Sequence, residues 1–95
     1  MQTYLLFVTY HAKAGRGAAF VQELEQSGTA AKVRAEEGCI RYDYYFSAQD
    51  PDCVLLFEEW ESKTHQQVHL TQPHIADVKA IKEKHIESTE LRDLA

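Results

Sequence analysis

Three histidines fall within a short stretch of this 95-residue chain, at His65, His69 and His74. Imidazole accepts a proton near neutral pH, which makes histidine the commonest general base in enzymes. His74 follows Pro73, a residue typical of the first turn of a helix, and the positive end of a helix dipole favours a neutral imidazole. We therefore take His74, with His69 beside it, as the candidate catalytic bases.

A metal site is the alternative use of these histidines. His65 and His69 are four residues apart and could share one helical face, but no third ligand is apparent beside them. Cys39 and Cys53 lack the spacing of a zinc site and, in a hairpin, would lie further apart than the roughly 7 Å that a disulfide allows. We therefore expect no metal ion at these residues and two free thiols.

Glu58 and Trp60 are two residues apart in an apolar run typical of a β-strand, so their side chains point to the same face. A lone tryptophan in a strand is most often a core residue, and a glutamate beside it most often serves a nearby cation or tyrosine. A buried carboxylate, however, needs a hydrogen bond or a raised pKa. We expect Glu58 to orient the base or a substrate hydroxyl, and Trp60 to support a flat ring.

The preceding strand is joined to this one by a turn at 49–52 that contains Asp-Pro-Asp, a pattern typical of a β-hairpin with a longer loop. A four-residue loop brings Arg41 and Asp43 to the face of Glu58, which favours a polar or phosphorylated ligand. A loop one residue longer or shorter brings two tyrosines there instead, which favours a flat aromatic ligand. The sequence leaves both registers open. The candidate substrate-binding residues are therefore Tyr42, Tyr44, Arg41 and His65.

Hydrophobic periodicity predicts the elements that must position these residues. Strands are expected at 2–10, 37–46, 53–60 and 86–94, and helices at 18–36, 62–71 and 73–84, with a loop at 11–17. Gly28 interrupts the first helix, Gly38 fits the turn into the second strand, and Ser62 can cap the second helix. The first helix is expected to bury Phe20, Val21, Leu24 and Ala31. The last is expected to bury a stripe of Ile75, Val78 and Ile81, backed by Ala76 and Ala80.

The predicted order β-α-β-β-α-β describes a single α+β domain over 1–95, with a ferredoxin-like antiparallel sheet and helices on one face. The first and third strands are apolar on both faces, whereas the helices can cover only one. A second copy of the sheet is the simplest cover for the other face. The sequence therefore predicts a homodimer that forms through the sheet.

Composition excludes several partners. The net charge is −5 and there is no cluster of lysine or arginine, so we expect no nucleic-acid partner. No apolar run is long enough to span a bilayer, and the basic-then-apolar order of a signal peptide is absent. We expect a cytoplasmic protein that binds a small molecule and does not contact a membrane.

The chain resembles the antibiotic biosynthesis monooxygenase (ABM) family, whose domain is a dimeric α+β barrel of ferredoxin-like topology. The resemblance covers nearly the whole chain. It rests on Glu37-Gly38-Cys39 with Tyr42 three residues on, Asp50-Pro51 in the turn, Glu58-x-Trp60, and His69 followed by Pro73-His74. It implies the oxidation of a quinol or a phenolic polyketide by O2 without metal, flavin or haem.

The same superfamily implies two other activities. Its haem-degrading branch uses an Asn on the first strand, a Trp ending the third and a His on the last helix. Of these the chain keeps only Trp60, with Lys79 near the helical position, so haem degradation is disfavoured. Another branch has a Glu-Gly-x-x-Arg-aromatic-Asp stretch similar to 37–43 and acts on a phosphorylated autoinducer-2 sugar. There Arg41 would bind the anion, with His11 or Lys13 as a further anion site.

The first expectation is therefore a dimeric monooxygenase of a small aromatic hydroquinone or phenol, with His74 or His69 as base. The second is an isomerase or lyase that acts on a small, phosphorylated carbonyl compound. The third is a non-catalytic, small-molecule-binding stress-response dimer, which a filled core without a cavity beside Trp60 would favour.

Overall fold

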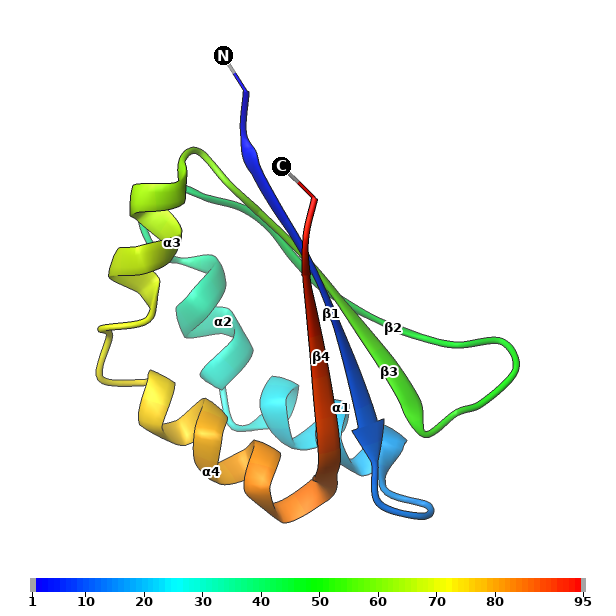
Figure 1. Ribbon diagram of the computed structural model, residues 1–95. Helices are drawn as coiled ribbons and strands as arrows, with labels where there is room; N and C mark the ends of the chain where they lie inside the picture. Colours follow the sequence, from blue (N-terminus) through cyan, green and yellow to red (C-terminus); the bar gives the residue numbers. More distant parts are fainter. Residues whose placement is uncertain (1, 95) are drawn as a thin grey trace.

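Within residues 2–94, four antiparallel strands form one sheet in the order β2-β3-β1-β4, and four helices lie on one of its faces (Figure 1). The strands are β1 (Tyr4–Ala12), β2 (Cys39–Phe46), β3 (Cys53–Trp60) and β4 (Ile86–Asp93). The helices are α1 (Gly17–Gln26), α2 (Thr29–Arg34), α3 (Lys63–His69) and α4 (Ile75–His85). The predicted ferredoxin-like α+β fold is confirmed, with each helical segment divided in two. Met1 and Ala95, the ends of the predicted domain, lie outside the residues that this computed structural model describes.

Strand β1 begins and ends two residues later than the sequence predicted, at Tyr4 and Ala12. His11 pairs with Cys53 of β3, and the amide of Ala12 donates to the carbonyl of Asp52 at 2.8 Å. The predicted loop at 11–17 is therefore wrong at its first two residues. Pairing with strands on both sides holds His11 and Ala12 in the sheet despite their weak strand propensity.

Helices α1 and α2 meet at Gly28, whose φ of 81° is the left-handed conformation that glycine adopts without strain. The interruption predicted at Gly28 is confirmed. The turn rotates α2 so that Ala30 and Val33 face the core, with exposed fractions of 1% and 0%. Ala31 is exposed, so its predicted place in the core is wrong.

Helix α4 packs beside α1 over the sheet. Of the predicted core residues, Phe20, Leu24, Ile75 and Ile81 are buried, and Val21 and Val78 are partly buried. Ala76 and Ala80, the predicted backing of the stripe, are exposed. The helix begins at Ile75, not at Pro73, because a tight turn precedes it in which the Ile75 amide donates to Gln72.

Helix α3 follows Ser62, whose hydroxyl accepts from the amide of His65 at 3.3 Å, so the predicted N-cap is confirmed. The helix ends at His69, two residues before the predicted end. Neither this helix nor any other in the described part of the chain is long and apolar enough to cross a membrane.

The β2–β3 hairpin adopts the tyrosine register. Tyr42 lies opposite Glu58 and Tyr44 opposite Leu56, and the amide of Ser47 donates to Cys53 at 3.0 Å. The loop is thus one residue longer than the four-residue alternative. Because side chains alternate along a strand, both tyrosines face the helices together with Glu58.

The other face of the sheet has no described helix over it (Figure 1). Leu5 and Phe7 of β1 and Leu55 and Phe57 of β3 alternate with buried residues and are only partly covered. An apolar open face of this kind is where a soluble protein binds a partner. The homodimer expected from the sequence stays a prediction.

Candidate functional site

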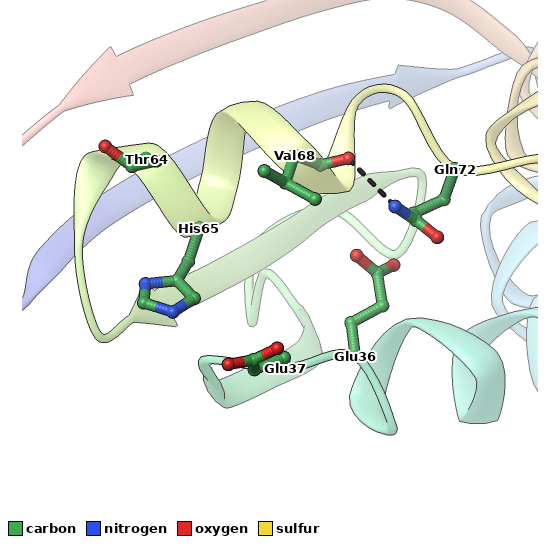
Figure 2. Close-up of a pocket in the computed structure, with 6 residues that line it drawn as sticks. All are labelled: Glu36, Glu37, Thr64, His65, Val68 and Gln72. Atoms are coloured by element: carbon green, nitrogen blue, oxygen red, sulfur yellow. Dashed lines mark hydrogen bonds between the residues drawn. The ribbon is translucent and has the colours of Figure 1, made fainter.

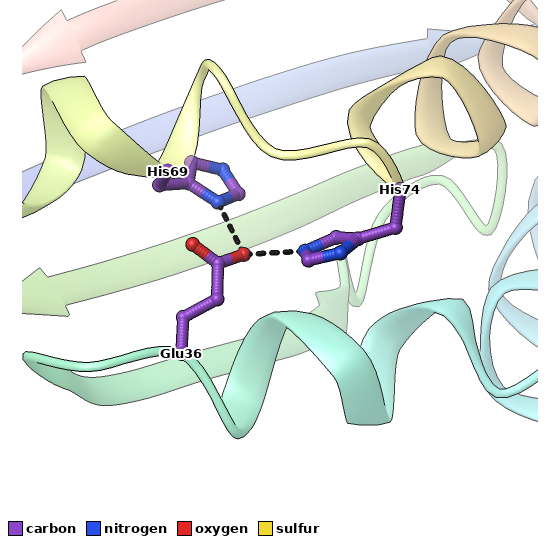
Figure 3. Close-up of side chains that lie close together, drawn as sticks. All are labelled: Glu36, His69 and His74. Carbon is purple, nitrogen blue, oxygen red and sulfur yellow. Dashed lines mark hydrogen bonds and ion pairs between the residues drawn. The ribbon is translucent and has the colours of Figure 1, made fainter.

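Glu36, His69 and His74 form a polar cluster at the edge of the core, hereafter the Glu-His cluster (Figure 3). One oxygen of Glu36, Oε2, lies 2.8 Å from Nδ1 of His69 and 2.6 Å from Nε2 of His74. Both distances fit imidazole N–H groups that donate to a carboxylate. The exposed fractions of the side chains are 9% for Glu36, 5% for His69 and 14% for His74. The two candidate bases are therefore held together by one nearly buried carboxylate.

The cluster is built at the end of α3 and in the connections that follow α2 and α3, not in the interiors of the elements. Glu36 follows α2, where its amide donates to the carbonyl of Val33 at 3.0 Å and continues the last turn. His69 is the last residue of α3. The amide of Gln72 donates to the carbonyl of His69 at 3.2 Å, and the resulting turn brings His74 back toward the same carboxylate.

Glu58 and Trp60 lie deeper, on the helix-facing side of β3. The indole Nε1 of Trp60 donates to Oε1 of Glu58 at 3.0 Å, and the two residues are 0% and 6% exposed respectively. Burial raises the pKa of Glu58, although the hydrogen bond from Trp60 and the nearby His69 oppose the rise. The buried carboxylate of Glu58 thus has a hydrogen bond and a raised pKa, either of which would meet the requirement stated in the sequence analysis.

Aromatic contacts join the two groups. The rings of Trp60 and His69 lie 4.8 Å apart at an angle of 34°, and the ring of Tyr42 meets the same imidazole edge-on at 6.0 Å. The hydroxyls of Tyr42 and Tyr44 are 3.4 Å apart. Burial raises the pKa of both tyrosines, so their hydroxyls stay neutral and cannot serve as bases at physiological pH.

A cavity of about 390 Å³ opens beside the Glu-His cluster, between α3 and the segment that follows α2 (Figure 2). Its lining residues are Glu36, Glu37, Thr64, His65, Val68 and Gln72. Glu36 belongs to both the cavity wall and the cluster, so it is the cluster residue that a ligand in the cavity meets. Trp60, which is fully buried, does not line this cavity.

The imidazole of His65 is fixed at this wall from two sides. Its Nδ1 lies 2.7 Å from the hydroxyl of Ser62, and its ring packs against Gly38 so closely that a Cβ there would overlap it. Gly38 also has a φ of 83°, so the predicted turn into β2 is confirmed. Glycine is required there both by the positive φ and by the close approach of the His65 ring. His65 and His69 do not form the metal-binding pair that was considered from the sequence, because the ring of His65 bonds Ser62 and that of His69 bonds Glu36.

The charged pocket expected from the other hairpin register does not form. Arg41 lies on the open face of the sheet, with Nε 3.8 Å from Asp43 and the guanidinium over the ring of Phe57. The other anion-site candidates are also engaged elsewhere: His11 bonds Glu90 at 2.7 Å, and Lys13 donates to backbone carbonyls of α4. Arg41 is therefore placed away from Glu58 and Trp60.

Glu36 is the residue of the Glu-His cluster that escaped the sequence analysis. Glu36 sits among charged residues that resemble the solvated end of a long helix, and only the early end of α2 at Arg34 turns it inward. Cys39 is a free thiol like Cys53, as predicted. Burial, helped by the charges of Glu36 and Glu58, raises the pKa of Cys39 to about 11, so it is a neutral thiol and not a nucleophile.

A family model and several known proteins match the chain. Residues 3–81 match the family model described as "Antibiotic biosynthesis monooxygenase". The "Probable quinol monooxygenase YgiN" of Escherichia coli (strain K12) is 35% identical over 51 residues, which cover 45% of this chain and 49% of that protein. The chain thus spans about half the length of the curated relatives it matches.

Solved structures share the fold. PA3566 from Pseudomonas aeruginosa has a TM-score of 0.85 and 23% identity, with 99% of this chain and 93% of that chain covered. Rv0793 from Mycobacterium tuberculosis has a TM-score of 0.83 and 23% identity, with 99% and 94% covered. Identities this low establish a common fold and nothing finer.

Proposed function

Because the chain belongs to the antibiotic biosynthesis monooxygenase family, we propose that it oxidises a small aromatic hydroquinone or phenol with O2 and needs no metal or organic cofactor. The observation that carries this proposal is the Glu-His cluster, in which Glu36, at the wall of a cavity, is hydrogen-bonded to two imidazoles behind it. Such a unit can accept a proton from a phenolic ligand. The partial likeness to a relative named for quinol oxidation supports the choice of hydroquinones as the first substrates.

The proposed chemistry begins when the base removes a proton from an electron-rich phenol or hydroquinone. The resulting anion is a reductant strong enough to pass an electron to O2. Recombination forms a carbon–oxygen bond, and loss of water leaves a new ring carbonyl. For a ring CH2 group the balance is CH2 + O2 → C=O + H2O, so one oxygen atom enters the product and the other leaves as water.

The exposed fractions of the two imidazoles indicate which of them acts as the base. The His74 side chain is 14% exposed and that of His69 5%, and His69 is also stacked on Trp60. We assign the base to His74, with Glu36 as the cavity-facing group that orients both the imidazole and the substrate hydroxyl. His69 keeps the carboxylate in place from the core side.

Trp60 supports the substrate ring only if α3 moves, because the indole is fully buried. Helix α3 has seven residues, and about half of Val68, at the cavity, and of Leu70, just after the helix, is exposed. An outward shift of this short helix would extend the cavity toward Trp60, while Glu58 would stay hydrogen-bonded to the indole. Tyr42 and Tyr44 would then form the far wall.

The open face of the sheet binds a second copy in this proposal. Its apolar residues come from both central strands, and a copy of the same face would bury all of them at once. Helix α3 and the Glu-His cluster lie on the opposite side of the sheet, so dimer formation leaves the cavity accessible (Figure 1).

A second candidate function is non-catalytic binding of a small molecule. The complete burial of Trp60 favours it, because the cavity beside the cluster does not reach the indole. The isomerase or lyase alternative gains no such support, since Arg41 lies on the open face.

Isotope labelling separates these functions. Metal-stripped protein is incubated under 18O2 with a panel of hydroquinones and anthrone-like phenols, and the products are analysed by mass spectrometry. The monooxygenase proposal expects one labelled oxygen atom per product molecule, formed faster than in the protein-free control. Binding of panel compounds without any labelled product would support the binding function and contradict the enzymatic one.

A further inference from the structure

The Glu-His cluster also has the composition of a metal site. The candidate donor atoms, Nδ1 of His69, Nε2 of His74 and a carboxylate oxygen of Glu36, all lie within 4.8 Å of one another. The sequence predicted no metal because His65 and His69 lacked a third ligand. The structure replaces that pair with a different one, His69 with His74, and adds Glu36 as the third donor.

The present spacing is close to that of a coordinated set. Zinc–nitrogen and zinc–oxygen bonds of roughly 2.0–2.2 Å place neighbouring tetrahedral donors about 3.4 Å apart. Glu36 Oε2 now lies 2.8 Å and 2.6 Å from the two nitrogen atoms. Each of these two contacts has to lengthen by less than about 1 Å to admit an ion, and the three donor atoms already lie within 4.8 Å of one another. Each ligating nitrogen must then direct its lone pair, not its proton, at the ion.

Burial and charge favour a cation at this position. Glu36 is nearly buried, and its carboxylate lies close enough to Glu58 that its charge contributes to the raised pKa of that residue. Two neighbouring carboxylates in a poorly solvated region attract a divalent ion. Two imidazole nitrogens select a transition metal over Ca²⁺ or Mg²⁺, which prefer oxygen ligands.

Three protein donors leave coordination positions unfilled. Glu36 lines the cavity beside the cluster, so those positions face a space that can hold water or a small ligand. Sites with three protein ligands and an open position exchange ligands, whereas structural zinc sites are closed by four.

We propose that Glu36, His69 and His74 bind one divalent transition-metal ion of the Zn²⁺ and Co²⁺ class, with its open positions facing the cavity. The ion uses His74 and Glu36, the two groups to which the proposed oxidation assigns its base and its orienting carboxylate. Metal binding therefore withdraws the base and stops that oxidation. The binding itself does not depend on the proposed function, because a protein without any oxidase activity would still hold the ion.

Titration of the metal-stripped protein with Co²⁺ and Zn²⁺ tests the site. Calorimetry is expected to give one ion per chain, Co²⁺ to develop visible absorption bands, and Zn²⁺ to compete it away. NMR is expected to show paramagnetic broadening of the ring protons of His69 and His74, with those of His11 unaffected. Binding of less than one equivalent at millimolar metal, or broadening of other histidines instead, would overturn the proposal.

Matched variants locate the donors. Glu36→Gln keeps the side-chain size and one acceptor oxygen, and is expected to weaken Co²⁺ binding at least tenfold, with a circular-dichroism melt to show that it folds. His65→Ala removes the histidine that lines the cavity wall, and the double variant Cys39→Ser, Cys53→Ser removes both thiols; both are expected to bind Co²⁺ like the wild type. Binding that survives Glu36→Gln but is lost in either control would place the metal elsewhere and refute the site.

Discussion

The indole ring of Trp60 lies over the imidazole of His69, with centroids 4.8 Å apart and planes inclined by 34°. This contact joins the end of β3 to the end of α3, and so couples the buried pair Trp60 and Glu58 to the Glu-His cluster at the cavity. A substitution at Trp60 should therefore alter the Glu-His cluster, and a substitution in the cluster should alter the packing of Trp60.

Truncation of Trp60 tests the core side of this contact. Trp60→Ala removes a fully buried ring and the donor that satisfies Glu58, so we expect a loss of about 3–5 kcal/mol in the free energy of unfolding. Urea unfolding followed by circular dichroism measures it. Val68→Ala, at a half-exposed position of α3, is the control and should change stability by less than about 0.5 kcal/mol. Equal effects of the two substitutions would mean that Trp60 does not anchor the core.

Glu58 gives a prediction with a definite sign. Its pKa is raised in the folded protein, mainly by burial, so the folded state favours the protonated form. The stabilisation from this group is full below the unfolded pKa, close to 4.5, and is lost as the pH rises through the folded pKa.

Glu58→Gln removes the charge but keeps an acceptor for Trp60. We expect the variant to match wild-type stability near pH 4 and to exceed it increasingly toward pH 8, as measured by urea unfolding at several pH values. A variant that is less stable than wild type at pH 8 would show that the ionised carboxylate is held by bonds that outweigh its burial.

Alanine substitutions at Gly38 and Gly15 separate the cost of backbone strain from the cost of steric overlap. Gly38→Ala introduces both, because φ is positive and the new Cβ meets the ring of His65. Gly15→Ala introduces strain alone, since its φ is 75° but nothing lies within 4 Å of the Cβ position. We expect a loss of about 1–2 kcal/mol for Gly15→Ala and a further 1–3 kcal/mol for Gly38→Ala.

A double-mutant cycle checks the steric part. In a His65→Ala background, Gly38→Ala should lose that further cost and fall close to the value of Gly15→Ala, as measured by the same unfolding experiment. An undiminished penalty would mean that the imidazole does not pack on Gly38 in solution.

The open face predicts the oligomeric state. Sedimentation equilibrium of the wild type should give the mass of two chains, because a copy of the sheet is the proposed cover for Phe7, Leu55 and Phe57. Leu55→Glu places a charge in the middle of that face and should give a monomer. Lys63→Glu, on exposed α3, is the matched surface change and should leave the dimer intact. A monomeric wild type would refute this part of the proposal.

The sequence was sufficient for the fold because its signals were local. The apolar runs of β1 and β3, the break at Gly28 and the cap at Ser62 are each signals that act within a few residues. The hairpin register was not predictable, since one residue of loop length exchanges the faces of β2 and therefore decides whether Arg41 or Tyr42 joins Glu58.

The site was only partly predictable for a related reason. Trp60, Glu58, His69 and His74 carry their chemistry in their residue types, so they could be named. Glu36 could not be named, because it is 33 residues from His69 and 38 from His74 in the sequence. The three residues meet only through the turn after α2 and the turn after α3. Contacts between loops leave no periodicity for a sequence to reveal.

The central claim is that the Glu-His cluster supplies the base for an O2-dependent oxidation. The most direct test is O2 uptake by metal-stripped protein with the hydroquinone and phenol panel, with wild type beside Glu36→Gln and His74→Ala. We expect uptake above the autoxidation rate for wild type and a loss of about 100-fold or more in kcat for His74→Ala, with a smaller loss for Glu36→Gln. Wild-type uptake that both variants retain in full would contradict the assignment of the base.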